Sequence, residues 1–386
     1  MTGPRFTSIE MIRKLVGYDT TSRDSNLALI DFVRGYLAEF GVESELFFDA
    51  EKRKANLFAT LGPRDRGGVM LSGHTDVVPV DGQDWSSDPF SIMEREGKLY
   101  GRGTSDMKSF VAVALALVPD FLARELKTPV HLALSYDEEI GCVGVRGMIA
   151  EIARRPVRPK LCIVGEPTLM QPVIAHKGKI SVRCAVRGRE SHSALTHLGV
   201  NAVEAAAEIV AYLKGMARKS RDRGPFDRQF SPPYTTIHTG TVRGGTALNI
   251  VPKDCEFVFE FRTLPGDPPE PLLEEVRRFA AGLVPEMQKV SPDTGISFEI
   301  LTSTVGLSEA PDSEVAELAR ALSGANTVGK VSFGTEAGLF QEAGIPTIVC
   351  GPGSIDEAHR PNEFIAIDQV RQCEAFLRRL IERVAV

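Results

Sequence analysis

The sequence has little that would point to a membrane or to a nucleic acid. Its longest apolar run, FVAVALALVPDFL from Phe110, is too short to cross a bilayer and contains Pro119 and Asp120. The net charge is -6, and the Lys and Arg residues are scattered rather than clustered. We therefore expect neither a nucleic-acid partner nor a membrane association.

Cysteine pairs and phosphate-binding loops are also missing. The six cysteines form no CxxC pair and no spacing typical of secreted domains, so we expect buried thiols. No GxGxxG follows a predicted strand, and no P-loop is present, which removes the sequence argument for a nucleotide. The first 20 residues have the apolar spacing of an amphipathic helix and lack the apolar core of a signal peptide, which favours a cytoplasmic protein.

The sequence does contain the pattern of an α/β protein. A chain of 386 residues exceeds the usual size of a single hydrophobic core, so we expect two domains. Short apolar runs bounded by Gly, Pro and Asp alternate with helical patterns through the first 170 residues. Strands are predicted at 68–73, 130–136, 161–165 and 347–351, and helices at 27–40, 107–124, 143–153 and from 368. The sheet is therefore expected to take strands from both ends of the chain.

The middle of the chain has a different pattern. KISVRCAVRG (179–188) and DCEFVFEFRT (254–263) alternate apolar and polar residues, as strands with one buried face do. The predicted order β-α-β-β-α-β matches a ferredoxin-like unit, with further strands at 235–242 and 295–302 and helices at 199–217 and 269–283. We expect residues 179–303 to be a domain inserted into a first domain made of 1–178 and 304–386. Residues 218–233 are expected to form an exposed polar loop.

Candidate ligands follow the predicted strands of the first domain. Open α/β sheets bind ligands outside the carboxyl ends of their strands, so these side chains are expected to converge, together with Asp106 before the 107–124 helix. Several carboxylates in one cleft repel each other unless a cation lies among them, and with two histidines present a divalent metal is the simplest choice. The residues that follow the strands are His74, Asp76, Asp137, Glu138, Glu139, Glu166 and His359.

The number of candidate ligands favours two metal ions. A catalytic zinc site with three protein ligands leaves a position open, so five candidates fill two such sites if one carboxylate bridges. Glu138 is then left to move protons, as hydrolysis requires. Asp76 is expected to hold the imidazole N–H of His74. The five candidate ligands are His74, Asp106, Glu139, Glu166 and His359.

The other histidines carry weaker arguments. His131 and His176 lie in strand-like runs, which favours structural roles. The sequence leaves His197 and His238 open. His192, in GRESHSA, would be a solvated turn residue if it were judged on its surroundings alone.

The segments LSGHTDVVP, LYGRGTSDMK, SYDEEIG, VGEPT, KGKISVRCAVRGRESHSA, LNIVP and EFR span nearly the whole length in this order. Together they resemble the dinuclear zinc deacylases and carboxypeptidases, a family that includes enzymes acting on acetylornithine, succinyl-diaminopimelate and acylated amino acids. Within that family, FGTEAGLFQEAGIPTIVCGPGSIDEAHRPNEF is most similar to the branch acting on acetylornithine. The resemblance implies a zinc-peptidase-like domain with a mixed sheet flanked by helices, and an inserted α+β lid that forms homodimers.

The resemblance also implies roles for residues. His74 and Glu166 would hold one zinc ion and Glu139 and His359 the other, with Asp106 between them; cobalt could replace zinc. Glu138 would be the general base and acid. His192 would reach from one subunit into the active site of the other, and Asn249 and Arg262 would hold the carboxylate of the substrate.

The expected reaction is removal of the acetyl group from N-acetyl-L-ornithine, a step of arginine biosynthesis. Another N-acyl amino acid, such as N-succinyl-diaminopimelate, is an alternative substrate, and a metal-containing binding protein without catalysis is a second alternative. The δ-ammonium of ornithine needs a counter-charge, for which Glu336, Asp356, Glu357 and Glu363 are all candidates. A succinyl group would bring an extra carboxylate into an acidic cleft, where the motifs offer no additional basic residue.

Overall fold

The computed structural model describes residues 3–385, which divide into two compact units. The first takes in the chain up to Ala175, Leu307–Lys330 and the chain from Thr335 onward. The second consists of His176–Gly306 and Val331–Gly334. The sequence placed the insertion at 179–303 and did not assign the short segment 331–334 to it.

The first unit is built around a mixed sheet with the order β1-β2-β6-β3-β7-β15-β8-β13, and β14 pairs with β8. Its centre is parallel: β6, β3, β7 and β15 run in one direction, whereas β2 and β8 run antiparallel to their central neighbours. The strands are β1 (Ser44–Phe48), β2 (Ala55–Leu61), β3 (Val69–His74), β6 (Val130–Ser135), β7 (Leu161–Pro167), β8 (Val173–His176), β13 (Leu307–Ser308), β14 (Gly329–Val331) and β15 (Thr347–Gly351).

This sheet confirms the predicted α/β fold with strands from both ends of the chain, because β15 lies beside β7. The sequence pattern did not predict β1, β2, β8, β13 or β14. A separate small sheet contains β4 (Met93–Arg95), β5 (Lys98–Tyr100) and β16 (Phe364–Ala366).

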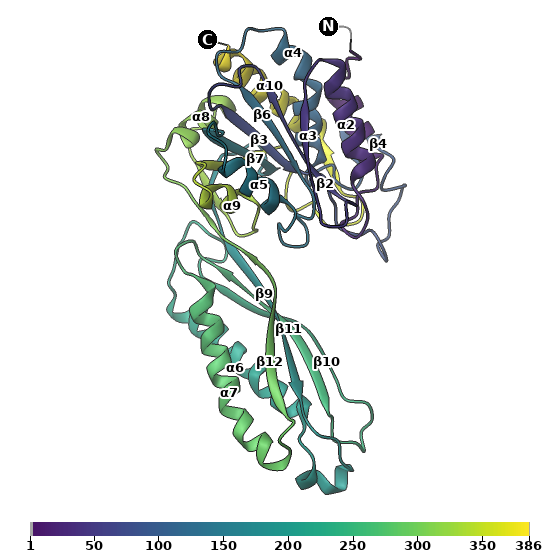
Figure 1. Cartoon of the computed structure of the whole chain (residues 1–386), viewed down its shortest axis with the longest axis vertical. Coiled ribbons are helices and arrows are strands. Elements are labelled where there is room, and N and C mark those ends of the chain that lie inside the picture. The colour runs from purple at the N-terminus through teal and green to yellow at the C-terminus, as the bar shows by residue number, and fades with distance from the viewer. Residues whose placement is uncertain (1–2, 386) are drawn as a thin grey trace. The chain divides into compact units, whose positions relative to one another are not determined.

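Helices cover both faces of the mixed sheet (Figure 1). On one face, the main apolar core is shared with α1 (Ser8–Val16), α2 (Leu27–Glu39), α3 (Lys108–Ala116), α4 (Val118–Leu122), α8 (Glu314–Ser323) and α10 (Ile367–Val384). On the other face lie α5 (Val145–Ala153) and α9 (Ala337–Glu342). The predicted single helix over 107–124 is wrong in one respect. It is interrupted at Leu117, because Pro119 has no N–H to donate to an i−4 carbonyl but is tolerated in the first turn of the new helix α4.

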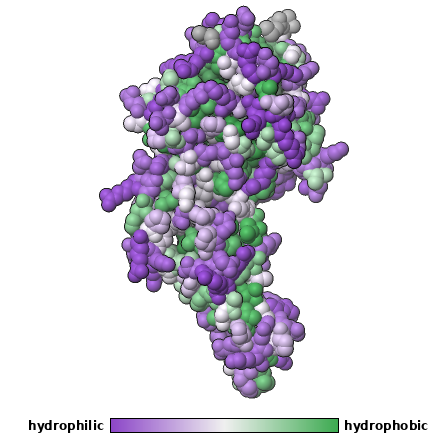
Figure 2. Space-filling model, turned by 60° about the vertical axis from the view of Figure 1, so that its left-hand side comes forward, coloured by the Kyte–Doolittle hydropathy of each residue, from purple (hydrophilic) through white to green (hydrophobic). Residues whose placement is uncertain are grey.

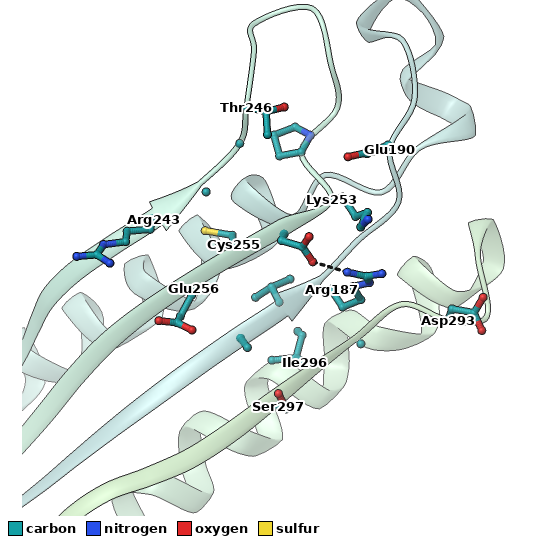
Figure 3. A pocket seen from close by; sticks show the side chains of 17 residues that line it. Arg187, Glu190, Arg243, Thr246, Lys253, Cys255, Glu256, Asp293, Ile296 and Ser297 are labelled. Atoms are coloured by element: carbon teal, nitrogen blue, oxygen red, sulfur yellow. Dashed lines mark hydrogen bonds and ion pairs between the residues drawn. The ribbon is translucent and has the colours of Figure 1, made fainter.

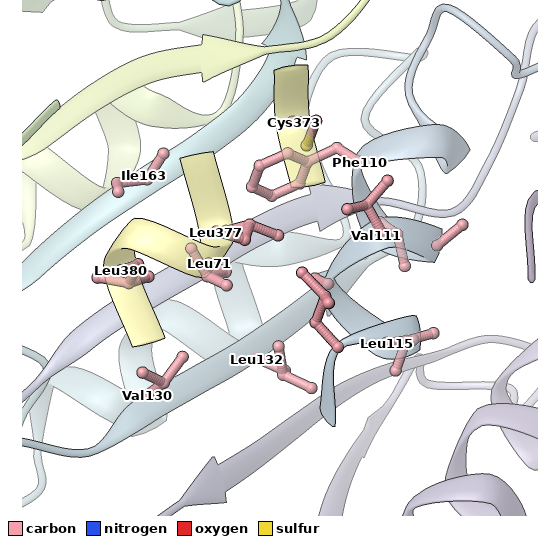
Figure 4. Close-up of a cluster of buried hydrophobic side chains, with 14 of the residues drawn as sticks. Leu71, Phe110, Val111, Leu115, Val130, Leu132, Ile163, Cys373, Leu377 and Leu380 are labelled. Carbon is pink, nitrogen blue, oxygen red and sulfur yellow. The ribbon is translucent and has the colours of Figure 1, made fainter. Parts of the chain in front are cut away.

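The core fixes α3 behind the ends of the central strands. Figure 4 shows Leu71 of β3, Leu132 of β6 and Ile163 of β7 facing side chains of α3 and α10. Phe110 of α3 packs so closely over Gly165 of β7 that a Cβ at Gly165 would lie 2.0 Å from the ring. Only glycine fits there, so this contact sets the position of α3 and of the loop before it, which carries Asp106.

The second unit has the order β10-β11-β9-β12 with all neighbours antiparallel, as expected for a ferredoxin-like unit. The apolar residues that alternate along β9 and β11 are buried against the two helices. Its elements are β9 (Gly178–Arg187), η1 (Ser193–Leu198), α6 (Ala202–Arg223), β10 (Thr236–Gly244), β11 (Asp254–Thr263), α7 (Pro269–Val290) and β12 (Gly295–Thr304).

Both helices of the second unit are longer than predicted. α6 continues into the segment expected to be a loop and ends at Arg223. The capping residue Gly224 follows, where φ is +73° and glycine is favoured. α7 continues through Pro285 to Val290, which adds Met287 to the buried core.

Hydrophilic residues cover most of the surface visible in Figure 2. Among residues 3–385, no helix combines the length and the apolar character needed to span a membrane. All six cysteines are buried and unpaired with one another, which confirms the prediction of buried thiols.

Candidate metal centre

The predicted metal ligands of the first unit converge at the carboxyl ends of the parallel strands. His74 is the last residue of β3, Glu166 lies in β7, and Glu139 follows β6. The Nε2 atom of His74 lies 3.0 Å from Oδ1 of Asp106 and 3.5 Å from Oε1 of Glu166. The Nε2 atom of His359 lies 3.2 Å from Oδ2 of Asp106 and 3.0 Å from Oε2 of Glu139. The structure thus brings all five together.

Asp106 occupies the centre of this arrangement. One of its carboxylate oxygens faces His74 and the other faces His359. No other carboxylate among residues 3–385 lies within 4.0 Å of a ring nitrogen of both histidines. A carboxylate with one oxygen toward each half of the cluster has the geometry of a bridging ligand.

Asp76 holds the cluster in a way that the sequence did not predict. The carbonyl oxygen of Asp76, rather than its carboxylate, accepts the hydrogen bond from Nδ1 of His74, at 2.9 Å; the carboxylate lies 3.6 Å away, too far for a hydrogen bond. The carboxylate instead accepts the backbone N–H groups of Glu138 and Glu139, at 3.1 and 3.2 Å, and the hydroxyl of Ser22 at 2.7 Å. Asp76 therefore orients His74 and the Glu138–Glu139 turn together.

Glu138 lies at the cluster, with ligand atoms within 4.8 Å of those of His74 and Glu166. The thiol of Cys142 donates to Glu138 Oε1 at 3.2 Å. Its role as a base rather than a ligand stays a prediction. The neighbouring Asp137 does not contact the cluster in this way: it forms a buried ion pair with Lys54, a residue for which the sequence offered no signal.

The pKa values reflect the crowding of carboxylates. Burial is the main cause that raises the pKa of Glu138 to about 8, and the charges of Glu139 and Asp106 add to it. Burial and the charge of Asp106 raise the pKa of Glu139 to about 7. Hydrogen bonds to Asp106 and Glu139 raise the pKa of His359 to about 10. Each shift reduces the negative charge of the cluster, as expected where carboxylates need a cation.

The donor set fits divalent metal ions. The Nδ1–H of His74 donates to a carbonyl, which leaves the Nε2 lone pair directed at the carboxylates. Oε1 of Glu166 is buried and has no hydrogen-bond partner among the described residues. Two ligand atoms on one tetrahedral zinc ion lie roughly 3.3–3.6 Å apart, close to the separations of 3.0 to 3.5 Å found here.

Glu336, one of the four acids predicted as candidates to face the ammonium of the substrate, is placed elsewhere. Its side chain is buried, with 1% of the residue exposed, and its two oxygens accept the hydroxyls of Ser72 and Ser135 at 2.6 and 2.7 Å. We correct that prediction, because a carboxylate enclosed beneath the strand ends does not face a ligand in the cleft. Glu363 is buried as well, in an ion pair with Arg102.

The predicted site residues of the second unit lie in two groups. His192 and Asn249 are on exposed loops joined by a hydrogen bond from Ser193 N–H to the Asn249 carbonyl, at 3.0 Å. Arg262 lies near the other end of β11, roughly 25 Å along the strand from Asp254, and its Nε donates to Glu260 at 2.9 Å.

A hollow of about 750 Å³ also lies in the second unit, around the ion pair of Arg187 and Asp254 (Figure 3). The residues that line it include none of the predicted site residues. Its size alone therefore gives it no part in the chemistry of the carboxylate cluster.

Comparison with known proteins identifies the family. Residues 70–383 match peptidase family M20/M25/M40. The chain belongs to this family. It is 36% identical over 378 residues to the acetylornithine deacetylase of Myxococcus xanthus, covering 96% of this chain and 95% of that protein. It is also 36% identical to the acetylornithine deacetylase of Proteus mirabilis, covering 97% of this chain and 96% of the relative. The chain is accordingly a metal-dependent amide hydrolase.

Solved structures share the fold. The M20 family metallo-carboxypeptidase Sso-CP2 of Sulfolobus solfataricus has a TM-score of 0.78 at 18% identity, over 98% of this chain and 99% of that one. The YXEP protein of Bacillus subtilis, described as a dinuclear metal binding peptidase, has a TM-score of 0.66 at 17% identity, over 98% and 97%. The family membership and the fold predicted from the sequence are confirmed.

Proposed function

We propose that this M20 enzyme removes the acetyl group from N-acetyl-L-ornithine and releases L-ornithine and acetate, a reaction of arginine biosynthesis. The main support is its similarity, over nearly the whole chain, to relatives named acetylornithine deacetylase. The cluster around Asp106 supplies residues suited to metal-dependent amide hydrolysis.

We further propose two divalent ions, which would be zinc. His74 and Glu166 would hold one and Glu139 and His359 the other, with Asp106 shared. Bound ions of this kind act as Lewis acids and make water a stronger nucleophile.

Glu138 would take the proton of the attacking water and return it to the nitrogen of the leaving amine. Its position supports this role, because Asp76 fixes its backbone N–H and Cys142 donates to its carboxylate. Glu138 is also partly buried, so that less bulk water competes for the proton.

The layout of the second unit supports a homodimer. His192 and Asn249 lie at one end of the unit, whereas the chain enters and leaves it at the other end, where Gly178 pairs with Thr263 and Thr304 with Lys179. Arg262 is at this second end. We propose that Arg262 holds the carboxylate of the substrate and that His192 and Asn249 are supplied by a second subunit.

The ammonium of ornithine would be bound by an acid near His359. Of the four acids considered from the sequence, Glu336 and Glu363 are enclosed by other side chains. Asp356 is exposed and Glu357 is partly exposed, so these two remain in the proposal.

A substrate panel tests the proposed activity. Acetate or succinate release is measured from N-acetyl-L-ornithine, N-succinyl-diaminopimelate and N-acetylated apolar amino acids, with zinc or cobalt added. We expect N-acetyl-L-ornithine to be preferred in kcat/KM by about 1–3 kcal/mol or more. Equal turnover of the succinylated compound would contradict the substrate while leaving amide hydrolysis in place.

Subunit mixing tests the proposed action of His192 across subunits. His192→Ala and Glu138→Ala are each expected to be inactive, and heterodimers of the two should recover activity, because one of the two sites then has both residues. His197→Ala, in the same exposed turn, serves as the matched control and should be active alone. Absence of recovery despite demonstrated subunit exchange would indicate that His192 acts within its own chain.

A further inference from the structure

A buried ion pair lies behind the metal centre, outside the set of proposed ligands. Arg102 and Glu363 are each only 1% exposed, and the guanidinium Nη1 lies 2.7 Å from Oε2 of Glu363. Both charges lose their hydration on burial, so such a pair is weak evidence for added stability. The groups that are hydrogen-bonded to Arg102 and Glu363 suggest another reason for the presence of this ion pair.

The free oxygen of Glu363 holds the loop that carries Asp106. Oε1 accepts the backbone N–H of Ser105 at 2.8 Å and that of Asp106 at 3.1 Å. Hydrogen bonds from N–H groups to an ionised carboxylate are stronger than those between neutral groups. Glu363 thereby fixes the backbone from which the central carboxylate of the cluster projects.

Arg102 extends the same network to His359. Its Nη2 donates to Oε1 of Gln83 at 2.6 Å, and Nε2 of Gln83 donates to the carbonyl oxygen of His359 at 3.0 Å. Nη1 of Arg102 also lies 3.4 Å from the carbonyl oxygen of Arg360.

The backbone at His359 needs such support. Its φ is +62°, in the left-handed region that residues other than glycine seldom adopt. A conformation of this kind persists only where surrounding contacts hold it. The Gln83 amide supplies one such contact at the carbonyl of His359 itself.

We infer that Gln83, Arg102 and Glu363 are positioning residues that set the separation of Asp106 and His359. They connect the loop between β3 and β4, the loop between β5 and α3, and the loop between β15 and β16 through one continuous set of hydrogen bonds. The inference rests on the proposed two-ion use of the cluster. It assigns the Gln83 contact to the ion held by His359 and Glu139, since Gln83 bonds the carbonyl of His359, whereas Glu363 acts on Asp106, which is common to both ions.

Zinc binding to the metal-stripped full-length chain tests this inference without reference to activity. Zinc is titrated in competition with a chelator, and the visible spectrum of the cobalt-loaded chain reports the ligand geometry. Gln83→Leu removes the three hydrogen bonds of the amide, to Arg102, Trp85 and His359, but leaves the ion pair of Arg102 and Glu363 in place. We expect one ion to bind as in the unmodified chain and the other 10- to 100-fold more weakly, the usual effect of altering a residue behind a metal ligand.

Gln341→Leu is the matched control. The Gln341 amide likewise makes three hydrogen bonds, two with the backbone of Ser308 and one with the carboxylate of Glu309, and it lies away from the network. The Gln341→Leu variant should bind both ions as the unmodified chain does. Glu363→Gln is a second test, since it retains an oxygen for the two N–H groups but loses the charge. It should weaken both ions, because Asp106 is common to them.

The outcomes separate this inference from the proposed function. Two ions bound with unchanged affinity and spectrum in both Gln83→Leu and Glu363→Gln would overturn the positioning role alone. If the unmodified chain bound only one ion, the two-ion assignment would be overturned and this inference with it. Deacetylation itself would still be judged by the substrate panel.

Discussion

The two halves of the metal centre are built differently. His74 and Glu166 belong to neighbouring parallel strands, β3 and β7, and their side chains are 1% and 5% exposed. Glu139 and His359 belong to loops, and the side chain of His359 is 52% exposed. The sheet fixes the first pair, whereas hydrogen bonds between loops fix the second. We therefore expect the ion at His74 to bind more tightly and to exchange more slowly than the ion at His359.

The largest effect is expected from Asp106→Ala, which removes the residue common to both halves. Both ions should bind poorly, and kcat/KM should fall by more than the roughly 10⁴-fold upper range of a lost general acid or base. Metal content after dialysis checks this. Retention of two tightly bound ions would show that the halves do not depend on a shared carboxylate.

Glu138→Gln should separate catalysis from metal binding. Glu138 belongs to neither proposed pair, so both ions should remain while kcat falls by about 10²- to 10⁴-fold. Glu139→Gln provides the contrast, because it should weaken the ion at His359. Turnover of Glu138→Gln within about tenfold of the unmodified enzyme would contradict its role in proton transfer.

His359→Ala and Glu166→Ala compare the two halves directly. His359→Ala should lose one ion and retain the other, since His74, Glu166 and Asp106 remain. Glu166→Ala should weaken binding of the ion at His74, which is expected to be the tighter of the two. It should also lower thermal stability, because it empties a buried position in β7. Equal metal loss and equal stability in the two variants would argue against tighter binding of the ion at His74 than of the ion at His359.

The smallest effect concerns acid stability and does not involve the metal centre. Burial lowers the pKa of His131 from 6.5 to about 4, with the nearby charge of Arg155 contributing. The unfolded chain then binds the proton more readily, so stability is intact above pH 6.5 and decreases as the pH falls toward 4. The loss is at most about 3 kcal/mol.

Thermal unfolding of the metal-stripped chain between pH 4 and 7 measures this decrease. His131→Gln should show a shallower dependence on pH, and it provides the baseline for following metal release on acidification. An unchanged slope would mean that other groups cause the acid sensitivity.

The sequence predicted that the candidate metal ligands would lie together because the physical rule is simple: parallel strands bring their carboxyl ends to one edge. His74, Glu139 and Glu166 could be placed by that rule without knowledge of the packing. β9 and β11 could be predicted just as directly from their alternating apolar and polar residues, since one face of each strand is buried. Pro119 was visible in the sequence, and its effect on the 107–124 helix could have been predicted.

The contacts of individual carboxylates could not be predicted in this way. Glu336 accepts hydrogen bonds from Ser72 and Ser135, more than 200 residues earlier in the chain for each, and nothing in FGTEAG indicates that both hydroxyls would meet it. The same applies to Asp76, whose carboxylate is directed by the turn that presents the N–H groups of Glu138 and Glu139. Such details depend on tertiary packing rather than on local pattern.

The position of β15 between β7 and β8 has a consequence for the order of events during synthesis. β7 and β8 leave the ribosome roughly 180 residues before the strand that lies between them. At 5–20 residues per second, the nascent chain waits about 10–40 s with a parallel edge of its sheet unfilled. During that interval His359 has not been made either, so the growing chain would acquire its full set of metal ligands only as translation nears its end.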